Sequence, residues 1–186
     1  GFNPFVAEVA RKSLEFERES HQSSWPYPNK ASALSAQKHC HRNNSECSSS
    51  IKDFLGTSCL IVDQRSTPSA KAFWQHTGLG LSSREAAIAL GREKEASALD
   101  GHCARNELLN RLANIYNCDS SLIRLHRSGM AALTTTLLAI KCIKGNSSIL
   151  QIGFPYVDVL KLPQIVFQGS NLIINTNLSY IKEQLD

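Results

Sequence analysis

The stretch RSGMAA at residues 127–132 joins a strand-like segment to an apolar helical run. Residues 121–125 (SLIRL) predict a strand, and residues 130–143 predict a helix that ends near Gly145, where a C-cap glycine belongs. A Ser-Gly step at the start of a helix leaves backbone N–H groups without intrahelical partners, at the positive end of the helix dipole. Gly129 has no Cβ, so a ligand can approach the backbone closely. The stretch therefore favours a phosphate site, although Ser128 is equally a plain N-cap.

Downstream of this stretch, strands alternate with helices. Residues 149–154 (ILQIGF) and 171–176 (NLIINT) predict strands that are apolar without interruption. A helix is expected to start at Pro155 and to be kinked or shortened by Pro163, and another to cover residues 178–185. Apolar strands separated by helices predict a parallel sheet with βαβ crossovers.

Upstream of the stretch the pattern is mainly helical. Helices are predicted over residues 1–20, 66–74, 84–99 and 104–116, a short buried strand over residues 58–62 (SCLIV), and a loop over residues 76–83. Asp100-Gly101 separates the last two helices, and the second has an apolar face formed by Leu108, Leu109, Leu112 and Ile115. Residues 21–50 are rich in Ser, Asn, His and Pro and contain WPYP, which predicts a long loop.

Composition excludes several classes of protein. An apolar fraction of 42% is too high for a disordered chain. The net charge of +4 is dispersed, without the Lys/Arg cluster that nucleic-acid binding requires. No apolar run is long enough to span a bilayer. The six cysteines show no C-x-x-C pair, which favours a reducing compartment and a cytoplasmic location.

Four segments in the same order resemble one family. SGMAA at residues 128–132 is similar to a stretch of the pyridoxal-phosphate enzymes of Cys/Met metabolism, and LNRLANIYN at 109–117 is similar to the helix that precedes it. GFPYVDVLKL at 153–162 resembles the segment with the tyrosine that stacks on the cofactor ring, and FWQHTGLGLSSR at 73–84 resembles a loop of the fungal-type cystathionine γ-synthases. The resemblance covers residues 73–186 and is thin over residues 1–72.

The resemblance implies roles for five residues. Gly129 and Met130 match the pair whose backbone amides hold the cofactor phosphate, with Ser128 beside them. Tyr156 matches the ring-stacking tyrosine, although the residue is otherwise explained as a half-buried aromatic at a helix start. Arg84 matches an arginine that reaches a phosphate in the neighbouring subunit, and a solvated arginine explains it equally well.

The resemblance assigns no catalytic residue to this chain. No residue matches the lysine that joins the cofactor in this family, and Asp158 is expected to be a surface or capping residue rather than the partner of the pyridine nitrogen. His76 is given no role. His126 and Arg127 either add positive charge beside the phosphate site or face solvent.

Two further patterns are weak. His39, Cys40, His41 and Cys47 have metal-ligand chemistry but no matching second pair, so no metal site is predicted. The S-x-x-K spacing of Ser179 and Lys182 lies in an ordinary amphipathic segment and is attributed to chance.

The expected architecture is α/β. Residues 1–75 form an N-terminal extension that is mainly helical, and residues 76–186 form part of a fold-type-I pyridoxal-phosphate transferase domain. The resemblance implies γ-replacement on an activated homoserine by cysteine, which this chain does not perform alone. The alternative is a non-catalytic subunit that acts as a scaffold, for which Asn146, where the family often has an acidic residue, is a supporting departure. Either interpretation predicts an oligomer, or a partner that supplies the rest of the fold, because so few strands leave a sheet edge to be covered.

Overall fold

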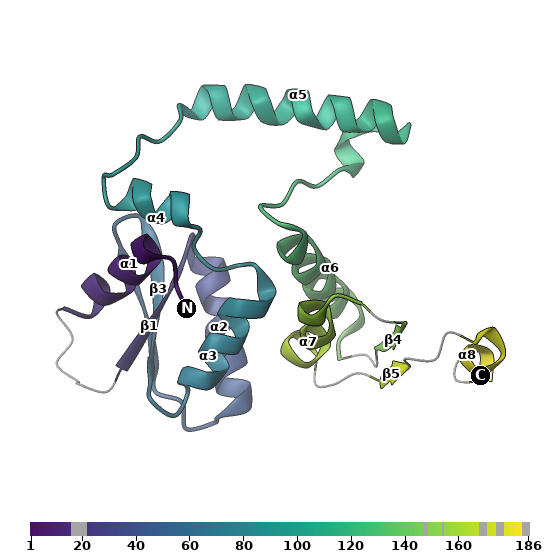
Figure 1. The fold of residues 1–186 in the computed structure, drawn as a ribbon, viewed down its shortest axis with the longest axis horizontal. Helices are drawn as coiled ribbons and strands as arrows, with labels where there is room; N and C mark the ends of the chain where they lie inside the picture. Colours follow the sequence, from purple (N-terminus) through teal and green to yellow (C-terminus); the bar gives the residue numbers. More distant parts are fainter. Residues whose placement is uncertain (16–21, 147–148, 154, 168–170, 174–176, 184–186) are drawn as a thin grey trace.

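The structure, a computed structural model, describes residues 1–15, 22–146, 149–153, 155–167, 171–173 and 177–183. Three parts follow one another along the chain (Figure 1). The N-terminal unit covers residues 1–89 and ends with helix α4. Helix α5, Ala98–Tyr116, stands apart from it, and the C-terminal group runs from residue 129 to residue 183.

A three-stranded antiparallel sheet forms the middle of the N-terminal unit. Strand β3 (Thr57–Asp63) is central, with β1 (Gln22–Tyr27) and β2 (Ser49–Phe54) on either side. Leu60 is paired with Trp25 on one side and with Ile51 on the other. Both pairings of β3 are antiparallel. The continuous apolar run of β3 does not distinguish this sheet from a parallel one, because such runs are also typical of parallel strands.

A tight hairpin joins β2 to β3. Leu55 and Gly56 both have positive φ values, 50° and 73°. Positive φ at both central residues is the signature of a type I′ turn, whose twist matches that of the two strands. The Thr57 hydroxyl donates to the Phe54 carbonyl at 2.7 Å and closes the turn.

Helices cover both faces of this sheet (Figure 1). Helices α2 (Lys30–Asn43) and α3 (Thr67–Thr77) pack on the face that carries Leu60 and Val62. Helices α1 (Pro4–Leu14) and α4 (Ser83–Ala89) pack on the face that carries Cys59. Successive side chains of a strand point to opposite faces, so β3 must be apolar at every position. Each fully buried Leu or Val of this kind contributes about 1.5–3 kcal/mol to stability.

The predicted long loop over residues 21–50 is wrong for its described part, which contains β1, α2 and the start of β2. Two physical features hide these elements. β1 lies at the edge of the sheet, where Pro26, which has no N–H, is tolerated. α2 is buried through small side chains, Ala33, Ala36 and Cys40, so no large apolar residue marks its inner face.

The predicted helix boundaries around residue 100 are also wrong. α4 stops at Ala89, and Gly91 follows with a φ of 69°. α5 then runs from Ala98 straight through Asp100 and Gly101, because the Ser97 side chain caps it by accepting from the Asp100 amide at 3.0 Å. A glycine inside a helix costs only about 1 kcal/mol, which this helix tolerates.

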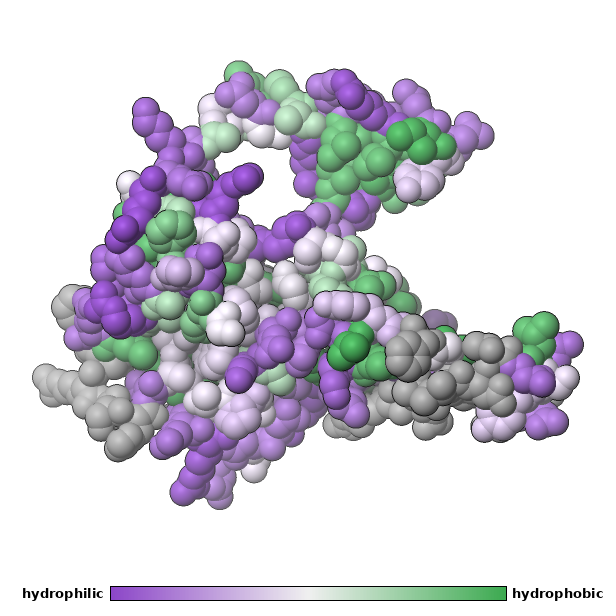
Figure 2. All heavy atoms as spheres, in the orientation of Figure 1, coloured by the Kyte–Doolittle hydropathy of each residue, from purple (hydrophilic) through white to green (hydrophobic). Residues whose placement is uncertain are grey.

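Helix α5 projects from the rest of the chain with its apolar face open (Figures 1 and 2). Leu108 is 46% exposed and Ile115 is 74% exposed. Its main neighbour among the described residues is the short 3-10 turn η1 (Ser120–Leu122), which occupies part of the predicted strand 121–125. That strand prediction is wrong, because the Asp119 carboxylate accepts from the Ser121 amide at 2.7 Å and stabilises a turn.

The C-terminal group contains one βαβ crossover. Strands β4 (Leu150–Ile152) and β5 (Asn171–Ile173) pair directly with each other in parallel. Helix α7 (Val157–Val166) connects them in the chain. The described residues show no larger parallel sheet, so the predicted sheet is limited here to this pair. The predicted helix over 130–143 is confirmed as α6 (Gly129–Lys144), and α8 (Leu178–Glu183) follows β5.

Pro163 lies inside α7 without a local break. A proline cannot donate to the carbonyl four residues earlier, here that of Val159. The Gln151 side chain of β4 donates to this carbonyl at 3.0 Å and replaces the missing bond. The helix continues for one more turn and ends at Val166.

Helix α7 connects the C-terminal group to the N-terminal unit. It packs against α3 and α6, and Leu162, Ile165, Val166 and Phe167 are buried. None of the described helices has both the length and the apolar character needed to cross a membrane.

Candidate functional site

The start of helix α6 is an open N-terminus. The Ser128 hydroxyl accepts from the Ala131 amide at 3.1 Å, so Ser128 is a regular N-cap. The amides of Gly129 and Met130 have no acceptor among the described residues, as expected for the first turn of a helix. A Cβ added to Gly129 would meet nothing within 4 Å, which leaves free space beside the backbone. This donor set fits a phosphate group.

The turn after α3 lies directly against this N-terminus. Gly78 ends α3 with a φ of 66°, and a Cβ placed on it would lie 2.7 Å from the Ser128 Oγ and 2.8 Å from the Ala131 amide nitrogen. The Thr134 hydroxyl, one turn into α6, donates to the Thr77 carbonyl at 2.9 Å. Gly78 therefore sets the distance between the N-terminal unit and α6. Sequence reasoning missed this contact because a glycine after a helix is already explained as a C-cap.

Arg127 is held by an ion pair across the same contact. Its guanidinium lies 2.8 Å from the Glu85 carboxylate of α4 and donates to the Gly80 carbonyl at 3.3 Å. A pocket of about 610 Å³ adjoins it, with Arg105, His126 and Arg127 among its lining residues. The Glu85 carboxylate already compensates the Arg127 charge, so the structure assigns Arg127 to an interhelical contact.

Arg84 and Tyr156 lie at the surface, separate from Ser128. Arg84 is exposed on α4 and forms no hydrogen bond or ion pair with the described residues. Tyr156 is the N-cap residue of α7, is 67% exposed, and its side chain makes no capping hydrogen bond. The structure of this single chain therefore brings together Ser128, Gly129 and Met130, but neither Arg84 nor Tyr156 bonds to them.

His76 of α3 and Asp158 of α7 are joined by a hydrogen bond. The His76 Nδ1 lies 2.8 Å from the Asp158 carboxylate, and both side chains are mostly buried. Asp158 is therefore a structural partner for a histidine that sequence reasoning left without a role.

A second cluster of polar groups surrounds the end of α7. Arg42 of α2 donates to the carbonyls of Ile165 and Val166, and the Lys141 ammonium of α6 donates to the Val166 carbonyl at 2.6 Å. His39 lies 3.2 Å from the Ile165 carbonyl. Burial, with a smaller contribution from the nearby Arg42 charge, lowers the pKa of His39 to about 4. This histidine is therefore neutral at pH 7 and belongs to the packing between α2 and α7.

The other members of the pattern around residue 40 are structural as well. Burial raises the pKa of the Cys40 thiol to about 12, with Cys47 and Asp63 adding to the shift, so the thiolate needed for metal binding is disfavoured. His41 is exposed and bonds to the Ser49 hydroxyl at 2.9 Å. Within the described part of the chain, no group of three His, Cys, Asp or Glu side chains has metal-binding geometry.

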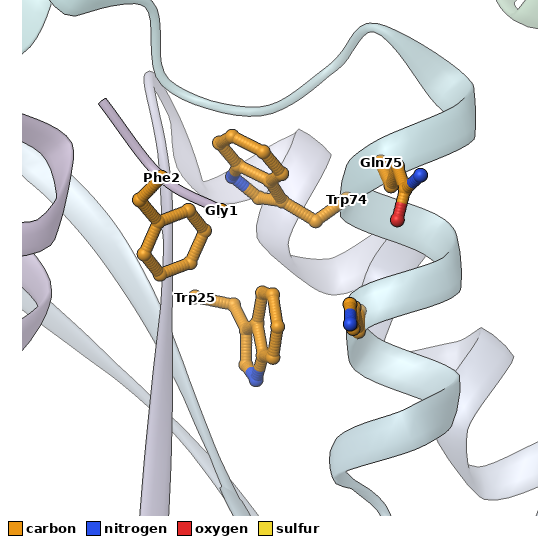
Figure 3. Close-up of a pocket in the computed structure, with 6 residues that line it drawn as sticks. Gly1, Phe2, Trp25, Trp74 and Gln75 are labelled. Atoms are coloured by element: carbon orange, nitrogen blue, oxygen red, sulfur yellow. The ribbon is translucent and has the colours of Figure 1, made fainter.

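An aromatic pocket of about 630 Å³ opens on the N-terminal unit (Figure 3). Phe2 lies edge-on to Trp25 at 5.1 Å and to Trp74 at 4.6 Å between ring centroids. Both indole N–H groups are satisfied: Trp74 donates to the Pro26 carbonyl and Trp25 to the Ser23 hydroxyl, each at 3.0 Å. A Cβ on Gly80 would come within 2.4 Å of the Trp74 ring, so the loop after α3 is fitted closely to this tryptophan.

The fold defines a mixed α/β protein with a small antiparallel sheet and an open helix N-terminus beside it. Residues 5–82 match the family model described as the N-terminal domain of the fungal trans-sulfuration enzymes. No curated protein and no solved structure matches the chain.

The match falls mainly where the sequence motifs are few. It covers α1, the three-stranded sheet, α2, α3 and the Gly78–Gly80 turn, most of which lies in residues 1–72. The suggested cofactor residues Arg84, Ser128, Gly129, Met130 and Tyr156 all lie beyond it, so their roles stay predictions.

Proposed function

We propose that this chain is part of a pyridoxal-phosphate-dependent trans-sulfuration enzyme that resembles cystathionine γ-synthase. The reaction would be γ-replacement on an activated homoserine by cysteine. The family match of residues 5–82 supports the trans-sulfuration class. The observation that supports cofactor binding is the first turn of α6, where two amide donors and an unfilled space beside Gly129 face outward.

Each suggested residue has one physical task in this proposal. The Gly129 and Met130 amides hold the cofactor phosphate, and the Ser128 cap fixes their direction. Tyr156 lays its ring over the pyridine ring, and its exposure leaves that ring face free. Arg84, exposed on α4, reaches a phosphate bound by a second copy of the chain. The bound cofactor supplies an electron sink for bond changes in the amino-acid substrate.

The chain alone would be inactive, because none of its residues matches the lysine that joins the cofactor. The rest of the fold, or another protein chain, would have to supply that lysine in an oligomer. The six free cysteines fit the reducing conditions of the cytoplasm.

A second candidate function is a non-catalytic scaffold. The exposed apolar face of α5 favours it, because Leu108 and Ile115 need a partner to be removed from water. In this case the helices are retained for binding another protein, and the α6 N-terminus is an ordinary capped helix end.

Binding of pyridoxine 5′-phosphate, which has no aldehyde and forms no covalent bond, tests the phosphate site. Titration calorimetry should detect this compound but not pyridoxine, which lacks the phosphate. Gly129→Ala should weaken the binding at least about tenfold, since the new Cβ fills the space beside the amides. Gly101→Ala, which likewise adds a Cβ in open space on α5, is the matched control. Equal affinity for the Gly129→Ala and Gly101→Ala variants would exclude this phosphate site.

The protein from its natural source separates the two candidate functions. Pyridoxal phosphate is added, the sample is reduced with borohydride, and the intact mass is measured. A mass well above the 20.5 kDa of this chain, with one pyridoxyl group on a lysine, supports the enzyme. A mass of this chain alone without a specific adduct supports the scaffold.

A further inference from the structure

Helices α2, α3, α6 and α7 enclose a pocket of about 340 Å³, which we call the basic pocket. Three basic side chains line it, Lys38 and Arg42 of α2 and Lys141 of α6. Its apolar lining includes Phe73, Leu138 and Ile165. Its volume lies at the lower end of the range for small-molecule sites.

The positive charge in the basic pocket has no carboxylate counterpart. Among the described residues, no Asp or Glu lies within ion-pairing distance of Lys38, Arg42 or Lys141. Burial lowers the pKa of Lys141, and the nearby Arg42 charge lowers it further, so the two cations repel each other. His39 is neutral at pH 7 and adds no charge.

The end of α7 offsets only part of this charge. Arg42 and Lys141 donate to the last carbonyls of α7, and a helix C-terminus carries roughly half a negative elementary charge. Three cations against that half charge leave an excess of about two and a half positive charges. A structural cap of α7 therefore accounts for the position of Arg42 and Lys141 but not for the number of cations.

Hydrogen-bond donors also remain unused. Arg42 directs both terminal nitrogens to carbonyls of α7, which leaves about two of its five N–H groups. Lys141 makes one hydrogen bond to a described residue and retains about two donors. Lys38 is exposed and makes none with the described residues. The three residues that carry these donors line one pocket, and such donors are the groups that bind carboxylates and phosphates in proteins.

We propose that the basic pocket binds a small organic anion. Its carboxylate or phosphate group lies among the three cations, and its apolar part lies on the wall formed by Phe73, Leu138 and Ile165. This site is separate from the α6 N-terminus, because Lys141 follows Ser128 by about 20 Å along the helix axis. The inference does not depend on cofactor binding.

Titration of the whole chain with phenyl phosphate tests the proposal, since this compound carries both an anion and an apolar ring. Isothermal calorimetry at low salt should show binding that weakens as salt is added. Inorganic phosphate should bind more weakly and phenol not measurably. A parallel titration with benzoate shows which anionic group the pocket prefers. No binding of either phenyl phosphate or benzoate would overturn the proposal, as would equal binding of phenol.

Lysine variants locate the binding. Lys38→Gln removes an exposed charge without any hydrogen bond to the described residues, so the fold should be unaffected, and Lys141→Gln removes the second ammonium. Each should weaken phenyl phosphate binding roughly tenfold. Lys71→Gln, an exposed lysine of α3 that lines the aromatic pocket instead, is the matched control and should bind as wild type does. Wild-type affinity in both Lys38→Gln and Lys141→Gln would place the anion elsewhere and overturn the proposal.

Discussion

The N-terminal unit and the part of the chain from α5 onward use their apolar residues differently. In the N-terminal unit, helices on the two faces of the sheet bury Leu60 on one face and Cys59 on the other completely. From α5 onward, Ile115, Ile143 and Tyr156 are each more than 60% exposed. The family match covers most of the closed unit and none of the open part. The difference is that the first region encloses most of its large apolar side chains, whereas the second leaves several of them exposed to solvent.

The largest expected effect comes from the same leucine-to-alanine substitution made in both regions. Leu60→Ala should lower the free energy of unfolding by about 2–5 kcal/mol, because it leaves a cavity in the central strand. Leu99→Ala, at a leucine of α5 that is 72% exposed, should change it by less than about 0.5 kcal/mol. Urea unfolding of the two variants measures both values. Similar losses in both variants would mean that α5 packs against the rest of the chain in solution.

The junction between the two regions is tested with a pair of glycines. Gly78→Ala and Gly91→Ala both place a side chain at a positive φ, which costs about 1–2 kcal/mol. Only at Gly78 does the new Cβ also meet Ser128 and Ala131, so this variant should lose at least about 1 kcal/mol more. Thermal unfolding followed by circular dichroism compares the two. Equal losses would contradict the close approach of α6 to the turn after α3.

Acid should weaken the contact between α2 and α7. The pKa of His39 is about 4 in the folded chain, below the ordinary 6.5, so the unfolded chain binds the proton more readily. The stabilisation is complete above pH 6.5 and is lost as the pH falls towards 4. Wild type should therefore lose about 2 kcal/mol more stability between pH 7 and pH 5 than His39→Gln does. Urea titrations at both pH values measure this difference, and parallel losses in the two proteins would show that His39 is not buried.

One buried residue of the N-terminal unit, Tyr27, has a hydroxyl group without a hydrogen-bond partner among the described residues. Its side chain is completely buried. Tyr27→Phe removes this unpaired group while keeping the ring, so it should leave stability unchanged or raise it by about 1 kcal/mol. Tyr116→Phe, at an exposed tyrosine of α5, serves as the control. A loss of stability in Tyr27→Phe alone would reveal a partner for the hydroxyl.

The smallest expected effect concerns the hydrogen bond between His76 and Asp158, which joins the two regions. A double-mutant cycle with His76→Asn and Asp158→Asn should give a coupling of about 0.5–1 kcal/mol, because both side chains are mostly rather than fully buried. A coupling near zero would mean that α7 is held to α3 by apolar packing alone.

Sequence periodicity predicted the elements whose apolar residues are large. β3, α6 and β4 fall close to their expected positions, since each has large apolar side chains, and α3 begins where Pro68 predicts a first helical turn. β1 and α2 were missed because the first is an edge strand with a proline and the second packs through alanine and cysteine. The β2–β3 turn gave no signal either, since Leu55 occupies a position where Asn or Asp is usual.

The candidate site was predictable only in its local part. The Ser-Gly step marks the α6 N-terminus because a helix cap depends on neighbouring residues. The contact of Gly78 with Ser128, and the approach of Arg42 and Lys141 to the end of α7, join residues far apart in the chain. No local pattern encodes such contacts, so they could only be found in three dimensions.

The docking of α7 on α3 has a consequence for the order of events during synthesis. The N-terminal unit supplies most of its own core, apart from Ile165 of α7, and can begin to fold once it has left the ribosome. Helix α7 is made more than 70 residues later. At ordinary translation rates that interval is on the order of ten seconds, far longer than a small domain needs to fold. During this interval, Phe73 and the Arg42 guanidinium are not yet covered by α7. In a nascent chain of this protein, side chains of α2 and α3 that α7 later covers are therefore exposed to solvent for a short time.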